Sequence, residues 1–374
     1  MISFKDSKNS GTDIDLGNKC SKTAFSWAKR TFIFRKKLPG MVSEQLDGSF
    51  SNIIHFGQEK IAIASDGIGT KIELAERCGV YNTLGYDLVA MVCDDLIANG
   101  VEPTSISNIL DVDYLDHKIV NSLMEGLYNA ARFAKITVTG GEIAELGSRI
   151  SGFGKNMHFN WCSTALGYLP KDQDLIDGSK ISKGDCIIAL KSKGFRSNGF
   201  SKIRSIMEAS FGENWHEKTY EAKSIKQEKP DTNSSWGQIL LSPSLIYSPV
   251  ITKTLNKKIP IHGIAHITGG GIIDNLSRVL EKSGFGADIY NVFKPQDFMI
   301  QMQKLGEVPD KIAYRLWNMG NGMLVIVPAK NKNDIIDTFH KYGYFAQVAG
   351  QVISDNFVKL ETSGLDPDSI ICKL

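Results

Sequence analysis

The residue types that hold a metal-bound triphosphate stand together in one short segment of the chain. It contains Asp66, Gly67, Gly69, Thr70 and Lys71. A carboxylate can ligate Mg²⁺, glycines let the backbone approach phosphate closely, and a hydroxyl and an ammonium can face phosphate oxygens. The spacing of the Walker A loop is absent. The segment predicts an ATP site of another kind, with a tight turn capped by the aspartate as the alternative.

Further carboxylates could complete a metal site around this segment. The candidates are Asp87, Asp94, Asp95 and Glu142, the last of which follows a Gly-Gly step. Mg²⁺ prefers a few carboxylates together with phosphate oxygens and water, so acids collected from several elements would make a nucleotide–metal site. For any one of them alone, a solvated surface acid is the alternative.

A second anion-binding candidate is the glycine run of Thr268, Gly269, Gly270 and Gly271. It joins a predicted strand at 261–267 to a predicted helix at 272–282. Backbone N–H groups and the positive end of a helix dipole attract phosphate at such a junction, and a flexible linker is the alternative. His262 and His266 would point to the same side of the strand, which favours packed or substrate-facing histidines over a metal pair.

The elements that must position these residues alternate between strands and helices, which predicts an α/β or α+β fold. The strands are expected at 61–64, 106–112, 136–139, 159–169, 186–190, 261–267, 323–327 and 347–352. The helices are expected at 19–30, 87–99, 118–133, 201–210, 272–282 and 334–342. The strand at 61–64 is predicted to be buried, the helix at 87–99 to carry its acids on its surface, and the segment 212–237 to be an exposed insertion.

Length and composition narrow the class of protein. A chain of 374 residues is too long for one ordinary core, and a linker near 170–172 predicts domains at 1–170 and 171–374. The net charge of +2 favours small-molecule partners over nucleic acid or a membrane surface. The six cysteines form no C-x-x-C pair, and neither a secretory signal nor a membrane-length apolar run stands out, so a reducing cytoplasm is expected.

Taken in order, the motifs resemble the phosphoribosylformylglycinamidine cyclo-ligase family, also called aminoimidazole ribonucleotide synthetase, over nearly the whole chain. The matching segments are 10–18, 66–71, 85–91, 95–96, 100–103, 140–142, 197–199 and 262–271. Collinear motifs are more specific than any single one.

The resemblance implies a two-domain fold. An N-terminal mixed sheet with helices would bind ATP and Mg²⁺ and form a homodimer, and a C-terminal α/β domain would close the cleft. The implied reaction is ATP-dependent ring closure of formylglycinamidine ribonucleotide to aminoimidazole ribonucleotide. Asp66, Asp87 and Glu142 would hold Mg²⁺, Lys71 would contact phosphates, and Asn198 with residues 268–271 would line the cleft. Lys71, Asp66 and Asn198 are the implied catalytic residues.

The chain departs from the family pattern at several places. Asp47-Gly48-Ser49-Phe50-Ser51 stands where a Gly-Gly-Phe-Gly segment is usual, and Arg196 replaces the histidine of Gly-x-His-Ser-Asn-Gly. The family's Asn-Asp-Leu becomes Asp94-Asp95-Leu96, and the segments at 142–148 and 317–322 also differ. Arginine stays charged at pH 7 and cannot shuttle protons as histidine does.

Two alternatives therefore stay open beside the cyclo-ligase. One is a paralogue on the same fold with a shifted substrate, since related enzymes make selenophosphate, phosphorylate thiamine monophosphate, or dehydrate a carbamoyl group during hydrogenase maturation. Cys20 lacks the setting that the first needs, and Cys372 only superficially resembles the C-terminal cysteine of the last. The other is a nucleotide-binding regulatory homologue without cyclo-ligase activity.

Overall fold

The computed structural model describes residues 14–42, 51–221 and 234–374, and the described strands form two sheets. The first sheet has the order β1-β2-β3-β6-β4-β5. Its strands are β1 (Met41–Val42), β2 (Asn52–Phe56), β3 (Glu59–Gly67), β4 (Glu102–Val112), β5 (Thr137–Glu145) and β6 (Phe159–Leu169). Because β4 and β5 run parallel and the other neighbours antiparallel, the sheet is mixed, as predicted.

The second sheet has the order β13-β12-β9-β11-β7-β10-β8 and takes its strands from the C-terminal half. They are β7 (Cys186–Lys191), β8 (Gly263–His266), β9 (Gly286–Ile289), β10 (Asn321–Val327), β11 (Ala346–Ile353), β12 (Phe357–Glu361) and β13 (Ser369–Lys373). The predicted boundary at 170/171 falls between the last strand of one sheet and the first of the other. The division into domains at that residue stays a prediction.

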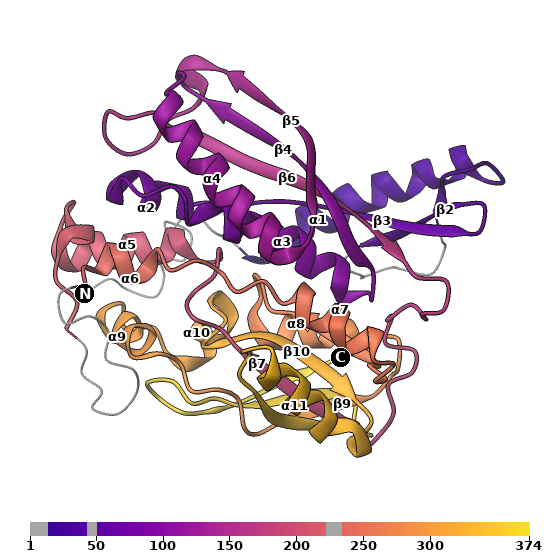
Figure 1. Ribbon diagram of the computed structural model, residues 1–374. Coiled ribbons are helices and arrows are strands. Elements are labelled where there is room, and N and C mark those ends of the chain that lie inside the picture. The colour runs from indigo at the N-terminus through magenta and orange to yellow at the C-terminus, as the bar shows by residue number, and fades with distance from the viewer. Residues whose placement is uncertain (1–13, 43–50, 222–233) are drawn as a thin grey trace.

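Helices pack around both sheets, which confirms the predicted mixed α/β class. In chain order they are α1 (Ile14–Thr31), α2 (Lys71–Cys78), α3 (Leu84–Ala98), α4 (His117–Ala134), α5 (Phe200–Phe211), α6 (Trp236–Leu240), α7 (Ser248–Asn256), α8 (Gly271–Leu280), α9 (Asp297–Leu305), α10 (Asp310–Leu316) and α11 (Lys332–Lys341). Figure 1 shows α3 and α4 crossing one face of the first sheet, with the C-terminal half, in orange and yellow, on the far side of α3.

Helix α3 is the element that joins the two halves. It packs against α4, β3 and β6 on one side and against α7 and β8 on the other. Its apolar residues are therefore buried nearly all round, as expected for a helix covered on both sides. The predicted surface position of its acids is wrong, because Asp87 and Asp94 are completely buried. A buried carboxylate needs a partner, so the C-terminal half must supply charges or donors.

One face of the first sheet is open. Along β6 the side chains alternate between buried and exposed, as do those of β4, because helices cover only one face. Ile109 is 51% exposed and Leu166 is 38% exposed on the uncovered face. The prediction of a buried strand at 61–64 is correct only for alternate residues, because Ile63 also lies on the open face and is 44% exposed.

Three other expectations change. Strand β5 does not end at the Gly-Gly step but continues through Glu142 to Glu145, paired with β4. The segment 212–237 is not simply exposed, because Trp215, Tyr220 and Trp236 at its flanks are buried. The predicted strand at 261–267 is shorter, as β8. Residues 10–13, 47–50 and 222–233 of the predicted features lie outside the described residues. In the described part of the chain no helix is both long and apolar enough to cross a bilayer.

Candidate active site

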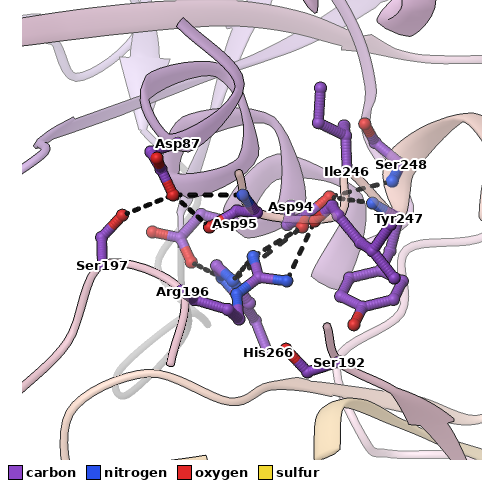
Figure 2. Close-up of polar contacts among 12 residues, drawn as sticks. Asp87, Asp94, Asp95, Ser192, Arg196, Ser197, Ile246, Tyr247, Ser248 and His266 are labelled. Carbon is purple, nitrogen blue, oxygen red and sulfur yellow. Dashed lines mark hydrogen bonds and ion pairs between the residues drawn. The ribbon is translucent and has the colours of Figure 1, made fainter. Parts of the chain in front are cut away.

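Three acids on α3 face the C-terminal half. Asp87, Asp94 and Asp95 are spaced i, i+7 and i+8, which places them on one side of a helix. Figure 2 shows them pointing toward residues of the C-terminal half, with Asp87 near Ser197 and Asp94 and Asp95 near Arg196 and His266. One wall of the candidate site is therefore a row of carboxylates on a buried helix.

Lys71 and Asp87 form a closed ion pair. The Lys71 ammonium donates to both Asp87 oxygens, at 2.9 and 2.8 Å, and to the carbonyl of Ser242 at 2.7 Å. Asp87 also accepts from the backbone N–H and hydroxyl of Ser244 and from the Ser197 hydroxyl. Burial lowers the pKa of Lys71, and Asp87 opposes that shift. All three ammonium donors are used, so Lys71 can reach a phosphate only by giving up one of these partners.

Arg196 and Asp94 form the second buried pair. Nη2 of Arg196 lies 2.9 Å from Oδ2 of Asp94, and neither side chain is more than 1% exposed. The other oxygen of Asp94 accepts from the backbone N–H groups of Tyr247 and Ser248, at 2.8 and 2.9 Å. Ser248 is the first residue of α7. The carboxylate thus holds the N-terminus of that helix and neutralises the guanidinium at once.

His266 at the end of β8 continues this network to Asp95. Its Nε2 lies 2.9 Å from Nη2 of Arg196, and its Nδ1 lies 2.7 Å from Oδ1 of Asp95. Because arginine only donates, Nε2 must accept, and the ring proton sits on Nδ1 and is donated to Asp95. Burial, and then the Arg196 cation, lower the pKa of His266 to about 3. The imidazole is therefore neutral at pH 7.

Asp66, at the end of β3, lies near Asp95. Burial raises the pKa of Asp66, and the Asp95 carboxylate raises it further against a hydrogen bond from the Gly67 N–H. Burial also raises the pKa of Asp95, to about 7, although Arg278 and Arg196 oppose the shift. Two buried carboxylates whose charged forms are disfavoured by burial, one of them also by the other's charge, are the kind of ligand set that a divalent cation stabilises. These residues fit Mg²⁺ bound by two carboxylates and phosphate oxygens.

The glycine run 268–271 starts two residues after His266, the last residue of β8, and ends at Gly271, the first residue of α8. A Cβ at Gly271 would stand 1.7 Å from the carbonyl oxygen of Tyr314, so close backbone packing requires glycine there. Asn275 fastens the run by donating to the carbonyls of Gly269 and Gly271. Gly269 is exposed and faces the side chain of Asn198. The run is therefore rigid, with its exposed edge beside Asn198.

The segment 66–71, which was predicted to bind phosphate, lies opposite the loop around Asn198. Gly67 ends β3 against Cys162, and Gly69, with φ of +71°, faces the backbone carbonyl of Ser197. Thr70 precedes α2, and its hydroxyl accepts from that of Ser201. The structure thus brings the N-terminal segment and the loop around Asn198 together.

Glu142 does not join Asp66 within one chain. Strand register places Glu142 opposite Ile109, Ile109 opposite Cys162, and Cys162 opposite Gly67. Glu142 is thus three strands from β3 and shares the open face with Ile109. Asp66 precedes Gly67 and so points to the helix-covered face. Among the residues that the structure describes, no group of three His, Cys, Asp or Glu side chains could hold a metal ion.

Sequence reasoning therefore missed some of the groups that the site contains. It considered Asp94 and Asp95 without assigning them, treated His266 as a packed or substrate-facing residue, and regarded Arg196 only as a departure. The available signal was the i, i+7, i+8 row of acids in an otherwise apolar helix, since such a row needs partners of opposite charge.

Comparison with protein families matches both halves of the chain. A model described as AIR synthase related protein, N-terminal domain, matches residues 50–167, and the corresponding C-terminal domain model matches residues 182–362. The phosphoribosylformylglycinamidine cyclo-ligase of Thermococcus kodakarensis is 32% identical over 355 residues, which cover 95% of this chain and 97% of the relative.

Solved structures with the same fold are more distant in sequence. AaThiL complexed with AMPPCP and TMP matches with a TM-score of 0.56 and 15% identity, covering 88% of this chain and 92% of that chain. Hydrogenase maturation protein HypE in complex with ATP matches with a TM-score of 0.55 and 17% identity, covering 84% of this chain and 85% of that chain. At these identities the likeness concerns the fold alone.

Proposed function

The chain belongs to the AIR synthase related protein family, and we propose that it is an ATP-dependent phosphoribosylformylglycinamidine cyclo-ligase of purine biosynthesis. It converts formylglycinamidine ribonucleotide and ATP to aminoimidazole ribonucleotide, ADP and phosphate. The observation that carries the proposal is similarity to curated cyclo-ligases over 95% of the chain and 97% of the relative. Similarity of this extent leaves no large part of either chain unmatched.

ATP and Mg²⁺ are the proposed cofactors. Structural neighbours were solved with ATP or an ATP analogue, and the donor set of Asp66 and Asp95 fits a divalent cation. When bound, Mg²⁺ would neutralise charge on the phosphoryl oxygens. The roles first expected for Asp87 and Glu142 in metal binding remain predictions. Asp87 could serve only by leaving Lys71, and Glu142 only from a second copy or after a rearrangement.

The protein's own groups then bind and orient the reactants. We assign the backbone of the glycine run 268–271 and the segment 67–70 to the phosphates, because both lie at the start of a helix and face the same loop. The Asn198 amide, beside Gly269, can donate to the nucleotide or the substrate. Lys71 and Asp87 fix the spacing between the two halves. Such positioning supplies most of the catalysis in phosphoryl transfer.

The chemistry explains why ATP is needed. The γ-phosphoryl group moves to the amide oxygen, which is otherwise a poor leaving group. The amidine nitrogen then attacks the carbon of that amide group. The bond between this carbon and the phosphorylated oxygen breaks, and phosphate is released.

A homodimer through the open face of the first sheet is the proposed assembly. Its exposed apolar side chains include Ile63, Ile109, Leu166 and Tyr168. A contiguous apolar face of this kind is typical of a protein interface. In such a dimer Glu142 would face the second copy. All six cysteines are free, which fits a reducing cytoplasm as the proposed location.

The proposed function is tested by ADP release. Purified protein is given ATP, Mg²⁺ and formylglycinamidine ribonucleotide, and ADP and aminoimidazole ribonucleotide are measured. Release of both that depends on the substrate supports the proposal. Turnover with thiamine monophosphate instead would favour a shifted substrate, and folded protein that binds ATP without any turnover would favour the regulatory homologue.

A further inference from the structure

Arg196 is held in an unusual backbone conformation. Its φ is 58°, in the left-handed region that residues with a side chain rarely adopt. Its side chain is nevertheless 1% exposed, and its carbon Cζ lies 5.0 Å from the centre of the Tyr247 ring. A strained residue that is fully packed has its position determined by its surroundings.

The guanidinium joins helix α3, strand β8 and the loop before α7. Nη1 donates to the carbonyl of Leu245 at 3.0 Å, while Nη2 donates to Asp94 on α3 and to His266 on β8, both at 2.9 Å. A planar guanidinium can hold such a divided set of acceptors in fixed directions, whereas a lysine ammonium carries a single point of charge on a flexible stem.

The effect of Arg196 reaches the proposed phosphate site through His266. The arginine makes Nε2 an acceptor, which places the proton on Nδ1, and Nδ1 lies 2.7 Å from Asp95. His266 also stands two residues before the glycine run. One side chain therefore determines the direction of the Asp95 carboxylate and anchors the strand that carries the run.

We propose that Arg196 is a positioning residue for phosphoryl transfer, which through His266 fixes the Asp95 carboxylate beside Asp66, and that Arg196 and Asp94 form one unit that can be replaced only together. The first part rests on the proposed function. The two departures from the family pattern at 94 and 196 are thus the two ends of one ion pair. Exchanging only one end leaves a buried charge without its partner.

The test is a double-mutant cycle with Arg196→His, Asp94→Asn and the double variant. For each protein, kcat and KM for ATP are measured by ADP release, and the free energy of unfolding is measured in urea. Misplacement of a catalytic carboxylate by about 1 Å costs about 10²-fold in rate, so we expect each single variant to lose about 10²-fold in kcat with KM for ATP nearly unchanged. The double variant regains most of the unfolding free energy, because no buried charge is left unpaired, while its kcat stays low, because His266 still lacks the Arg196 donor.

A conservative variant separates positioning from folding. Arg196→Lys keeps the charge opposite Asp94, but a lysine cannot donate to Asp94, His266 and the Leu245 carbonyl in the directions that the guanidinium uses. We expect it to unfold nearer to the wild-type urea concentration than Arg196→His does, while its kcat falls as far. The matched control is a second cycle with Lys258→Met and Asp172→Asn, which removes an exposed ion pair. The effects of its two single variants on kcat and on the unfolding free energy should be small and additive.

The outcomes keep the two proposals apart. Wild-type protein that shows no turnover counts against the proposed function. In that case the double-mutant cycle is evaluated from the affinities of the four proteins for Mg²⁺ and ADP and from their unfolding free energies. Coupling between positions 94 and 196 in those two measurements supports the paired unit. Additive single effects, or a folded Arg196→Lys or Arg196→His variant with wild-type kcat and nucleotide affinity, would overturn the assignment.

Discussion

The Lys71 ammonium lies 2.8 Å from Oδ2 of Asp87, and both side chains are completely buried between the two halves of the protein. The pair stands next to the segment proposed to bind phosphate but has no contact with solvent. Lys71 also donates to Oδ1 of Asp87 and to the carbonyl of Ser242. Asp87 accepts from the hydroxyls of Ser197 and Ser244. The lysine expected to reach phosphate is thus a bridge between α2 and α3.

Removing one member of this pair should destabilise the protein. Breaking a buried ion pair costs about 3–5 kcal/mol, because the remaining charge is left without a partner. We expect Lys71→Met to lower the free energy of unfolding by about that amount, measured by urea denaturation. Lys258→Met, which breaks an exposed pair with Asp172, should cost less than about 1 kcal/mol. A stable Lys71→Met protein with weakened ATP affinity would instead make Lys71 a phosphate contact.

Asp66→Asn should lose activity and keep its fold. The amide has the same shape as the carboxylate but removes the charge that a cation requires, so kcat should fall at least about 10²-fold. Unfolding in urea should change little, because burial already disfavours the charge on Asp66. Glu59→Gln, at the exposed start of the same strand, serves as the control. Wild-type kcat in Asp66→Asn would remove this residue from the site.

The pKa of Asp95 gives stability a defined pH dependence. It is raised to about 7 in the folded protein, above the ordinary value of 3.8, so the folded state binds the proton more tightly than the unfolded state does. This contribution is present at low pH and is lost as pH rises from about 4 to about 7. Asp95→Asn mimics the protonated acid and should stabilise the protein at pH 8 by on the order of 4 kcal/mol, and by little at pH 4.

The measurement is urea unfolding of wild type and Asp95→Asn between pH 4 and pH 8 without Mg²⁺ or nucleotide. His266 contributes in the opposite direction, because its lowered pKa means that stability falls as pH falls from about 6.5 toward about 3. The comparison between the two proteins cancels that contribution as long as His266 keeps its contact with position 95. An Asp95→Asn gain that does not vary with pH would contradict the raised pKa.

The open sheet face should control the assembly. Ile109→Asp together with Leu166→Asp places two charges in the proposed interface, and the protein should become a monomer in size-exclusion chromatography with light scattering. Tyr128→Asp changes a side chain on α4 that is 63% exposed, and it should leave the assembly unchanged. Assembly of the double variant identical to that of wild type would place the interface elsewhere.

The sequence by itself determined the alternation of strands and helices, the glycine segments and the family. The strand at 159–169 and the helices near 118–133 and 272–282 were predicted closely, because apolar periodicity and nearby glycines are local properties of the chain. Asp66 at a strand end and the glycine run before a helix were also predictable, since covalent neighbours fix both. The opposite faces of Asp66 and Glu142 were not, because they depend on how four strands align.

The tertiary structure alone decided which charges meet. Arg196 bonds to Asp94, which lies 102 positions away in the sequence, and His266 bonds to Asp95, which lies 171 positions away. No local pattern encodes such distances, because the burial that makes each pair necessary arises only when α3 is covered on both sides. The acids predicted for the helix surface are buried for that reason. Burial turned Arg196 and Asp94 into an ion pair and gave His266, beside Asp95, one defined tautomer.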